Sequence, residues 1–506
     1  MAKRRRKRTQ PAQEHKAVQK AAGRSLRPAL WGALGLVLVG GTWGVYKKLS
    51  SRPEPVASPS GPNVLLISID MLRPDHLRCY GYHRETSPRL DQVAAEGVLF
   101  ENHISSTSWT LPAHAAMFTA LADSVHGCTD ADKKLSDKLV TLAERFAAGG
   151  YRTVGFFSGP YLHPAFGLGQ GFQHYENCTS FAKIIDGSPV ERWAMDSGVE
   201  QRSHRDITNH IVYPAVKTWL DQNGSSRFFM FIHMWDVHFD FIPPAPYETM
   251  FDPDYTGSVT GAVLDPRVNP EMPKRDLEHL LALYDGEIAW TDYYLGRILD
   301  DLESSGLLDE TVVAVTSDHG TEFFEHGGKS HRRTLFDEVI RIPLIIRYPA
   351  RLPAGLRVAE QTRIIDIGPT LLELAGLPPM HSVMGHSLVP LMLRQPPDFD
   401  NIAVAELFSL GRRMRTIRTL EWKFTELMMA DNARFYVDLV EDPGERRPLR
   451  DLAEGRGRQL LERYQTIVKA LDAWRAQASA GAERSTIPDD VLRQLRSLGY
   501  VGEEDP

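Results

Sequence analysis

Short, uniformly apolar runs most constrain the fold of this chain of 506 residues. The run NVLLISID at 63–70 is typical, because it lacks the polar alternation of a half-exposed strand and ends in an acid. Runs of this kind indicate strands covered on both faces, as in a parallel sheet. We expect such strands at 63–70, 151–158, 228–233, 311–316 and 342–346.

Helical segments separate these strands. The segment 277–302 places its apolar side chains near one face of a helix, and a shorter helix is expected at 139–148. Strands that alternate with helices predict an α/β fold with a doubly wound sheet. Ligands of such sheets bind outside the carboxyl ends of the strands, so the residues that follow each strand become candidates for a site.

The pattern changes after about residue 385. Short segments typical of antiparallel strands appear, and an amphipathic helix follows them. These elements are expected at 415–420, 422–427, 435–439 and 457–476. We therefore predict two folded units, a large domain at 63–385 and a small α+β C-terminal subdomain at 386–506.

The first 62 residues predict a membrane anchor. Residues 1–28 carry ten Lys or Arg and one Glu, and residues 29–46 are uncharged. A helix of this uncharged length is about 27 Å long, close to the ~30 Å apolar core of a bilayer. Because the more basic flank stays inside, we expect a single-pass protein with 1–28 in the cytoplasm and the body on the extracytoplasmic side. A Pro- and Ser-rich linker at 47–62 follows, and a cleaved signal peptide is the alternative interpretation.

The charge and the cysteine count exclude several classes of protein. The chain has 58 basic and 65 acidic residues, so 48 and 64 remain after residue 28, a net charge of −16. A body this acidic argues against general nucleic-acid binding. The 3 Cys exclude a disulfide scaffold and a Cys-rich zinc module, and leave open whether Cys128 pairs with Cys178. The oligomeric state is left open.

Polar residues close several of the expected strands. Asp70 ends the first, and Asp318 with His319 follows the strand at 311–316. His233 ends another strand, and Asp236 and His238 come shortly after it. Carboxylates together with imidazoles suit Zn²⁺ or Mn²⁺, whereas carboxylates alone suit Ca²⁺ or Mg²⁺. These strand ends therefore predict a divalent metal site.

Thr110 precedes a stretch that is expected to be helical, AHAAMFTAL, with Pro112 in the first turn. One interpretation is that its hydroxyl only caps this helix. The other is that the hydroxyl, lying among free N–H groups at the positive end of the helix, attacks an anionic ester. The pKa of a hydroxyl is too high for unaided attack, so this role needs a metal or a base.

Several motifs, in order, resemble those of the sulfatase family of the alkaline phosphatase superfamily, over about residues 63–500. They are NVLLISID, TSWTLPAHAAMFTAL, FIHMWDVHFDF, YDGEIAWTDYYLGRIL, TVVAVTSDHGTEFFEHGG, HRRTLFDEVIRIPLII and FYVDLVEDPGE. The resemblance implies a catalytic domain with a large mixed, mostly parallel sheet sandwiched by helices, as in alkaline phosphatase, plus a small C-terminal subdomain.

The resemblance also implies roles for individual residues. By position, Asp70, Asp318 and His319 would bind a divalent metal, and Thr110 would be both the nucleophile and a ligand of that metal. The residues that would line the pocket for the anionic group are His238, Lys329 and His331. Asp236 and His331 are also candidates for a second metal.

The chain departs from the family pattern at the nucleophile. Sulfatases use Cys or Ser in a Cys-x-Pro-x-Arg motif, oxidised to formylglycine, where this chain has Thr110-Leu-Pro-Ala-His114. Threonine cannot form that aldehyde because its β-carbon carries a methyl group. The acid that usually follows the first ligand is Met71. These departures make the site similar to those of the Thr-using phosphoesterases and phosphotransferases of the superfamily.

The function predicted from the sequence is a membrane-anchored, metal-dependent, sulfatase-like hydrolase. It would cleave phosphate or sulfate esters through Thr110, with phosphoesters preferred, and the metal would be Zn²⁺, Mn²⁺, Ca²⁺ or Mg²⁺. Lys329 and a His would stabilise the charged oxygens, while His238 or His331 protonates the leaving oxygen. The alternatives are a transferase that adds a phospho-substituent to envelope lipid or glycan, and a non-catalytic anchored binding protein.

Overall fold

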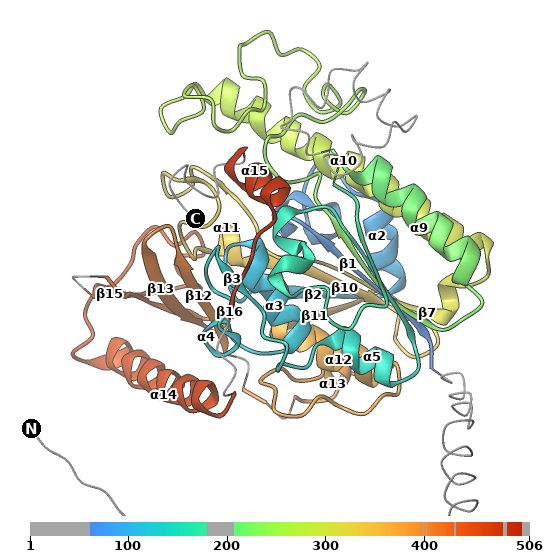
Figure 1. Cartoon of the computed structure of the whole chain (residues 1–506). Helices are drawn as coiled ribbons and strands as arrows, with labels where there is room; N and C mark the ends of the chain where they lie inside the picture. Colours follow the sequence, from blue (N-terminus) through green and yellow to red (C-terminus); the bar gives the residue numbers. More distant parts are fainter. Residues whose placement is uncertain are drawn as a thin grey trace, which may run out of the picture. The chain divides into compact units, whose positions relative to one another are not determined.

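The computed structural model describes residues 61–179, 207–397, 399–400, 402–429, 432–478 and 483–497 (Figure 1). The predicted basic segment, anchor and all but the last residues of the linker lie outside these ranges. Among the described residues, every helix is too short or too polar to span a bilayer.

A central sheet of eight strands carries the body, in the order β11-β2-β10-β7-β1-β6-β4-β5. Seven strands run parallel and β10 alone runs against them, so the sheet is mixed and mostly parallel, as expected. The strands are β1 (Asn63–Ile69), β2 (Val98–Ile104), β4 (Arg152–Phe157), β5 (His174–Asn177), β6 (Phe228–Met234), β7 (Thr311–Ser317), β10 (Arg341–Arg347) and β11 (Leu356–Arg363). Each strand predicted from an apolar run is present, whereas β2, β5 and β11 were not predicted because polar residues interrupt them.

The register of β1 brings two acids together at one edge of the sheet. All seven residues of β1 are buried between β6 and β7, which explains why the run carries no polar alternation. Ile69 of β1 pairs with Ser317 of β7. The next residue on each strand, Asp70 and Asp318, therefore leaves the sheet at the same level.

Helices cover both faces of the sheet, with α2, α9 and α10 on one face and α3, α5 and α12 on the other (Figure 1). The helices are α2 (Pro88–Glu96), α3 (Thr110–Thr119), α4 (Asp123–His126), α5 (Leu142–Ala148), α9 (Asn209–Asn223), α10 (Lys274–Ser304), α11 (Asp337–Ile340), α12 (Ile367–Leu374), α13 (Val389–Met392), α14 (Gly455–Ala478) and α15 (Asp489–Ser497). The predicted helices at 277–302 and 139–148 correspond to α10 and α5.

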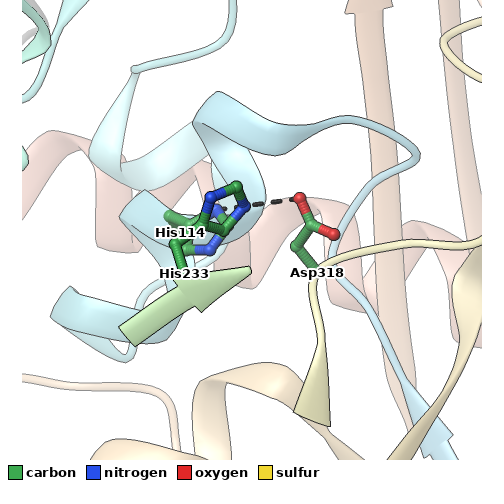
Figure 2. A group of neighbouring side chains, drawn as sticks. All are labelled: His114, His233 and Asp318. Carbon is green, nitrogen blue, oxygen red and sulfur yellow. Dashed lines mark ion pairs between the residues drawn. The ribbon is translucent and has the colours of Figure 1, made fainter. Parts of the chain in front are cut away.

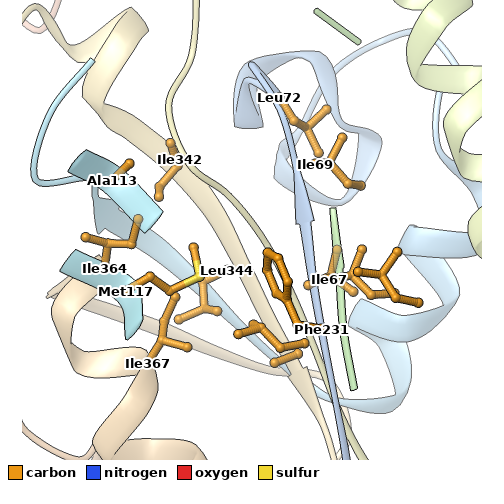
Figure 3. Close-up of a cluster of buried hydrophobic side chains, with 14 of the residues drawn as sticks. Ile67, Ile69, Leu72, Ala113, Met117, Phe231, Ile342, Leu344, Ile364 and Ile367 are labelled. Carbon is orange, nitrogen blue, oxygen red and sulfur yellow. The ribbon is translucent and has the colours of Figure 1, made fainter. Parts of the chain in front are cut away.

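Helix α3 is buried on every side, and this fixes the position of its first residue, Thr110. Figure 3 shows Ala113 and Met117 of α3 beside Leu344 of β10 and Ile367 of α12. A helix enclosed in this way has little freedom to slide or tilt, because protein interiors are close-packed. The start of α3 is therefore held at a set distance from the ends of the central strands.

The C-terminal part forms a second, four-stranded antiparallel sheet in the order β12-β13-β14-β15, with α14 beside it (Figure 1). Its strands are β12 (Ala403–Ser409), β13 (Arg412–Arg418), β14 (Trp422–Leu427) and β15 (Arg434–Asp438), and the short pairs are β3 (Lys133–Lys134) with β16 (Glu483–Arg484) and β8 (Glu322–Phe323) with β9 (Lys329–Ser330). The predicted α+β subdomain is confirmed, and its boundary at residue 386 stays a prediction. No disulfide joins Cys128 and Cys178, both of which are buried in the described chain.

A buried network of charges joins this second sheet to the large domain. Lys423 of β14 is 2 % exposed, and its ammonium donates to Asp337 of α11 and to Glu445, each at 3.0 Å. Arg418 of β13 donates to the same Asp337 carboxylate at 2.7 Å. Each of these buried charges has a partner of opposite sign. Loss of the Lys423 ammonium would leave the carboxylates of Asp337 and Glu445 with the Arg418 guanidinium as the one cation of this network.

We predict that Lys423→Met lowers the free energy of unfolding by about 3–5 kcal/mol, because breaking a buried pair leaves uncompensated charge. The matched control is Lys217→Met, because Lys217 is an exposed partner of Asp221 and the loss of an exposed ion pair should have little effect on stability. Denaturant unfolding of both variants measures the difference. Equal stabilities for the two variants would contradict the prediction.

Candidate active site

The four residues predicted to bind metal lie together at the carboxyl edge of the sheet. The Thr110 hydroxyl is 3.4 Å from Oδ2 of Asp70 and 3.4 Å from Nε2 of His319. Nε2 of His319 is 3.5 Å from Oδ1 of Asp70 and 3.4 Å from Oδ2 of Asp318. All four side chains are buried. The structure brings these residues together although they are separated by up to 249 positions (319 − 70). Their role as metal ligands stays a prediction.

Backbone groups hold the two ligands that follow β7. The Asp318 carboxylate accepts, at Oδ1, the N–H of His319 at 2.9 Å and that of Met71 at 3.4 Å. Nδ1 of His319 lies 2.9 Å from the carbonyl of Gly320, which can only accept, so this nitrogen carries the proton. The lone pair of Nε2 then points at Asp70 and Thr110, which is the orientation that a metal ligand needs.

The donor set fits a divalent cation. Oδ1 of Asp70 and Oδ2 of Asp318 are buried and accept no hydrogen bond from any residue that the structure describes. Burial raises the pKa of Asp70 to about 6, against the opposing effect of the His319 charge. Two carboxylates in this setting are costly unless a cation binds between them. Met71, which replaces the usual second acid, is buried and contributes only its backbone N–H.

Thr110 occupies the first turn of α3 and not the N-cap position that the sequence predicted. The residue before the helix is Trp109, with extended backbone, and within the described chain no side chain caps this end. The sequence predicted that the helix begins one residue later, at Leu111. Pro112 did not distinguish the two starts, because proline is accepted at either the second or the third position of a helix. The Thr110 hydroxyl consequently turns away from the helix, toward the strand ends.

Two of the predicted pocket residues lie beside the donor set. The His331 ring stacks on that of His319 with centroids 4.5 Å apart, and the His238 ring lies 5.2 Å from that of His331. Burial, with the nearby His319 charge, lowers the pKa of both His238 and His331 well below the usual range. Both imidazoles are therefore neutral at pH 7 in the free protein.

Lys329 points at a loop of the large domain. Its ammonium donates to the carbonyls of Val263 at 2.6 Å and Val268 at 2.7 Å. Burial lowers the pKa of Lys329, and the charge of Arg333 adds to this effect. The role of Lys329 toward a bound ester stays a prediction. Motif position alone does not show which acceptors a flexible side chain finds.

Asp236, a sequence candidate for a second metal, serves another purpose. Its carboxylate accepts the N–H groups of Thr208 and Asn209, at the start of α9, and the indole N–H of Trp290 at 2.7 Å. With these donors it neutralises the positive end of a helix. The structure therefore gives this acid a structural role, and the sequence hypothesis of a metal ligand at Asp236 was wrong.

Two further histidines complete the surroundings of the site: His233, which the sequence analysis noted as a polar strand end, and His114, to which it gave no role. Nε2 of His233 lies 3.4 Å from Oδ2 of Asp70, and Nδ1 of His114 lies 3.8 Å from Oδ2 of Asp318 (Figure 2). His114 occupies the position where the family motif has Arg. This departure from the motif was the sequence feature that indicated a place for His114 near the site. His233 was visible as a polar strand end, but the sequence does not show which way such a side chain points.

Comparison with known proteins agrees with this geometry. The family model described as Sulfatase matches residues 62–377. The chain belongs to the sulfatase family. A second model, described as N-sulphoglucosamine sulphohydrolase, C-terminal, matches residues 325–468. The protein is thus a sulfatase-family hydrolase in the class of sulfuric and phosphoric ester hydrolases, and members of this family depend on a metal.

The relatives are distant. The chain is 24% identical over 432 residues to arylsulfatase K of Bos taurus, covering 77% of this chain and 78% of that protein. It is 23% identical over 464 residues to an N-acetylglucosamine-6-O-sulfatase of Bacteroides thetaiotaomicron, covering 76% and 82%. The solved phosphonate monoester hydrolase of Agrobacterium radiobacter superposes with a TM-score of 0.68 at 23% identity, covering 82% and 96%. The fold is shared with both kinds of enzyme.

A further acidic group lies on the segment that follows β7. The Glu322 carboxylate is 1 % exposed, and neither of its oxygens accepts a hydrogen bond of normal geometry from the described residues. Burial and the neighbouring Glu338 raise the pKa of Glu322 to about 7. His326 uses Nδ1 on Glu338 and Nε2 on the Glu445 carbonyl, at 2.6 and 3.3 Å. This His therefore links the segment to the C-terminal subdomain.

We predict that Glu322 makes the fold less stable as the pH rises. Because its pKa is raised in the folded state, the folded protein holds a proton that the unfolded chain has lost between about pH 4.5 and 7. Stability should therefore fall through this window by on the order of 3 kcal/mol. Glu322→Gln should remove this part of the slope in thermal unfolding between pH 5 and 8. The exposed Glu360→Gln is the control, and an unchanged slope in Glu322→Gln would refute the prediction.

Proposed function

We propose that this sulfatase-family protein is a membrane-anchored ester hydrolase that uses Thr110 as its nucleophile and prefers phosphoesters to sulfate esters. The observation that carries the proposal is the position of the Thr110 hydroxyl, 3.4 Å from both Asp70 and His319. A hydroxyl that merely caps a helix would instead contact the N–H groups of its own first turn.

The metal site would activate this hydroxyl. Asp70, Asp318, His319 and the hydroxyl itself would hold the ion, and a bound divalent ion supplies the charge that lowers the pKa of an alcohol. The first turn of α3 contributes the N–H of Leu111 and the positive end of a helix, which favour the anionic group of a substrate. The two buried rings of His238 and His331 close the same region and exclude water from it.

The reaction then has two balanced steps. In the first, Oγ1 of deprotonated Thr110 forms a bond to phosphorus, the bond to the leaving oxygen breaks, and that oxygen takes a proton from His238 or His331. In the second, water attacks phosphorus, the Oγ1–phosphorus bond breaks, and the second water proton returns to the imidazole. Both imidazoles are neutral in the free protein, and the charge of a bound ester favours the protonated form that the first step uses.

The preference for phosphorus follows from the residue at position 110. The hydrate of formylglycine carries a second hydroxyl, through which sulfatases eliminate sulfate. Threonine carries a methyl group there, so its ester has to be cleaved by attack on phosphorus or sulfur. That the fold is shared with phosphonate monoester hydrolases as well as with sulfatases is consistent with phosphoester chemistry.

A transferase is the second candidate. The same Thr110 ester would be cleaved by an alcohol in place of water, and the uncharged run at 29–46 would keep the site close to lipid headgroups. Formation of a phosphorylated alcohol that exceeds formation of inorganic phosphate would favour it over hydrolysis. The third candidate, a non-catalytic binding protein, predicts no metal and no effect of Thr110 substitution.

We predict that Thr110→Ala lowers turnover of the full-length protein at least about 1000-fold, and that Thr110→Ser retains it within about tenfold, because serine keeps the hydroxyl. The assay compares an aryl phosphate, a phosphodiester and an aryl sulfate, with and without a chelator. Acid quenching followed by mass spectrometry should find phosphate on residue 110. The control is Thr119→Ala in the same helix, whose hydroxyl donates to the Ala115 carbonyl at 2.6 Å.

Two results would contradict the proposal. Full activity in Thr110→Ala would rule out the nucleophile. Higher turnover on the sulfate than on either phosphorus ester would rule out the substrate preference.

The membrane anchor is tested separately. We predict that the full-length protein sediments with membranes and resists carbonate extraction, and that Leu36→Arg with Val39→Arg releases it, since each charge at a helix centre costs about 2.5–3.5 kcal/mol. The control places the same two arginines in the linker, at Ser58 and Ser60. Release of the unchanged protein by carbonate would refute the anchor.

A further inference from the structure

Glu322, His326 and Glu338 form a second group of side chains of the kinds that bind metals, apart from the residues at the ends of β1 and β7. One ligand atom of each lies within 4.8 Å of the other two. Glu322 belongs to β8, His326 to the turn that follows it, and Glu338 to α11. Two carboxylates with an imidazole form a donor set that suits zinc and related ions. The resemblance to sulfatases gave none of the three a role.

The Glu322 carboxylate is directed into this group and lacks a partner. It is 1 % exposed, and neither oxygen accepts a hydrogen bond of normal geometry from the residues that the structure describes. The Thr334 hydroxyl lies near enough to favour the ionised carboxyl, but without the geometry of a hydrogen bond. A buried carboxylate without partners is costly, so it needs either a proton or a cation.

Other acids near this group already have cations of their own. Glu325 pairs with Arg73, and Asp337 pairs with Arg418. The two carboxylates of the group, by contrast, share the His326 imidazole as their one cationic partner in the described chain. Even a protonated imidazole leaves one negative charge, whereas a divalent ion balances both carboxylates.

Both ring nitrogens of His326 face acceptors. Nε2 lies 3.3 Å from the Glu445 carbonyl, which can only accept, so this nitrogen carries a proton. Nδ1 then has its lone pair directed at the Glu338 carboxylate, 2.6 Å away, and this contact needs a second proton or a cation between the two atoms. Metal-binding histidines typically donate their other N–H to a backbone carbonyl in this way. The Phe336 ring, stacked with centroids 3.5 Å apart, holds the imidazole in place.

We propose that Glu322, His326 and Glu338 bind a divalent ion of the zinc type, through one oxygen of each carboxylate and Nδ1 of the imidazole, with water completing its coordination. Metal bonds of about 2.0–2.2 Å require Nδ1 and the Glu338 oxygen to move apart by roughly half an ångström. The ion replaces a proton, so the pH slope predicted for Glu322 applies to the metal-free protein.

A cavity of about 220 Å³ gives ions and water a way to this group, because His326 and Glu338 both line it. Arginines line it as well. The guanidinium groups of Arg73 and Arg341 donate to acids and to a backbone carbonyl, respectively. Arg446 is exposed, so solvent screens its charge.

The ion would fasten the segment that carries two of the predicted pocket residues. Glu322 precedes Lys329 and His331 in the chain, and Glu338 follows them. One ion bound to both acids therefore joins the two ends of this segment without touching an ester. The role is structural, and the proposal does not rest on the proposed function.

Zn²⁺ binding by the full-length protein in detergent tests the proposal without an activity assay. The background is Asp70→Asn, which disables the donor set at the strand ends. After stripping with a chelator, this variant should still bind one Zn²⁺ per chain. Adding Glu322→Gln should weaken that binding at least about 100-fold, because even loss of an outer partner of a ligand costs about 10- to 100-fold. Adding Glu360→Gln, at an exposed acid, is the control and should change nothing.

Two results would overturn the proposal. One is Asp70→Asn protein that binds no Zn²⁺ after stripping. The other is an affinity for Zn²⁺ that Glu322→Gln leaves unchanged, which would show adventitious binding elsewhere.

A second variant gives a spectroscopic signature. In the Co²⁺-loaded Asp70→Asn protein, His326→Cys should gain a thiolate-to-cobalt charge-transfer band, because the cysteine sulfur would take the place of Nδ1. The exposed His83→Cys is the control and should lack the band. Bound Co²⁺ without this band in His326→Cys would show that position 326 does not reach the ion.

These outcomes are independent of the nucleophile. If Thr110→Ala is inactive but Glu322→Gln leaves Zn²⁺ binding unchanged, the proposed function stands and the structural ion falls. If Zn²⁺ binding follows Glu322 but Thr110→Ala is fully active, the structural ion stands and the nucleophile assignment falls.

Discussion

Two carboxylates at the tips of neighbouring parallel strands dominate this structure. Asp70 and Asp318 leave β1 and β7 at the same level because Ile69 pairs with Ser317, and both side chains are buried. Each keeps an oxygen that no described residue satisfies. Charges of the same sign in this setting favour either protonation or a cation. The raised pKa of Asp70 reflects the tendency toward protonation. The His319 imidazole and the Thr110 hydroxyl face the carboxylates, and together these groups form a donor set that suits a cation.

The departures from the sulfatase pattern are related to one another. Threonine at position 110 removes the aldehyde chemistry, and histidine at position 114 replaces the guanidinium of the family motif with a ring that binds the Thr110 carbonyl and Ser68. Methionine at position 71 removes an acid, while His233 brings a nitrogen to the same carboxylate. With these changes, oxygen and nitrogen donors lie side by side at the strand ends.

The C-terminal subdomain contacts the segment that precedes Thr110. Arg332 is buried, and its guanidinium lies 4.4 Å from the centroid of the Trp109 ring while donating to Ser409 of β12. Its backbone N–H donates to the carbonyl of Ser108 at 3.0 Å. The residues just before Thr110 are therefore held between the two sheets.

The sequence by itself determined the class of fold, the strands buried on both faces and the residues at their tips, because burial on both faces demands unbroken apolar runs and leaves polar residues only at the ends. It did not determine β2 or the two edge strands β5 and β11, whose polar residues break that pattern. Tertiary structure alone decided that the Thr110 hydroxyl turns away from its helix, that Asp236 binds the start of α9, and that His233 faces Asp70. The reason is physical: local sequence limits backbone conformation, whereas the direction of a side chain and its partners depend on segments far away in the chain that pack against it.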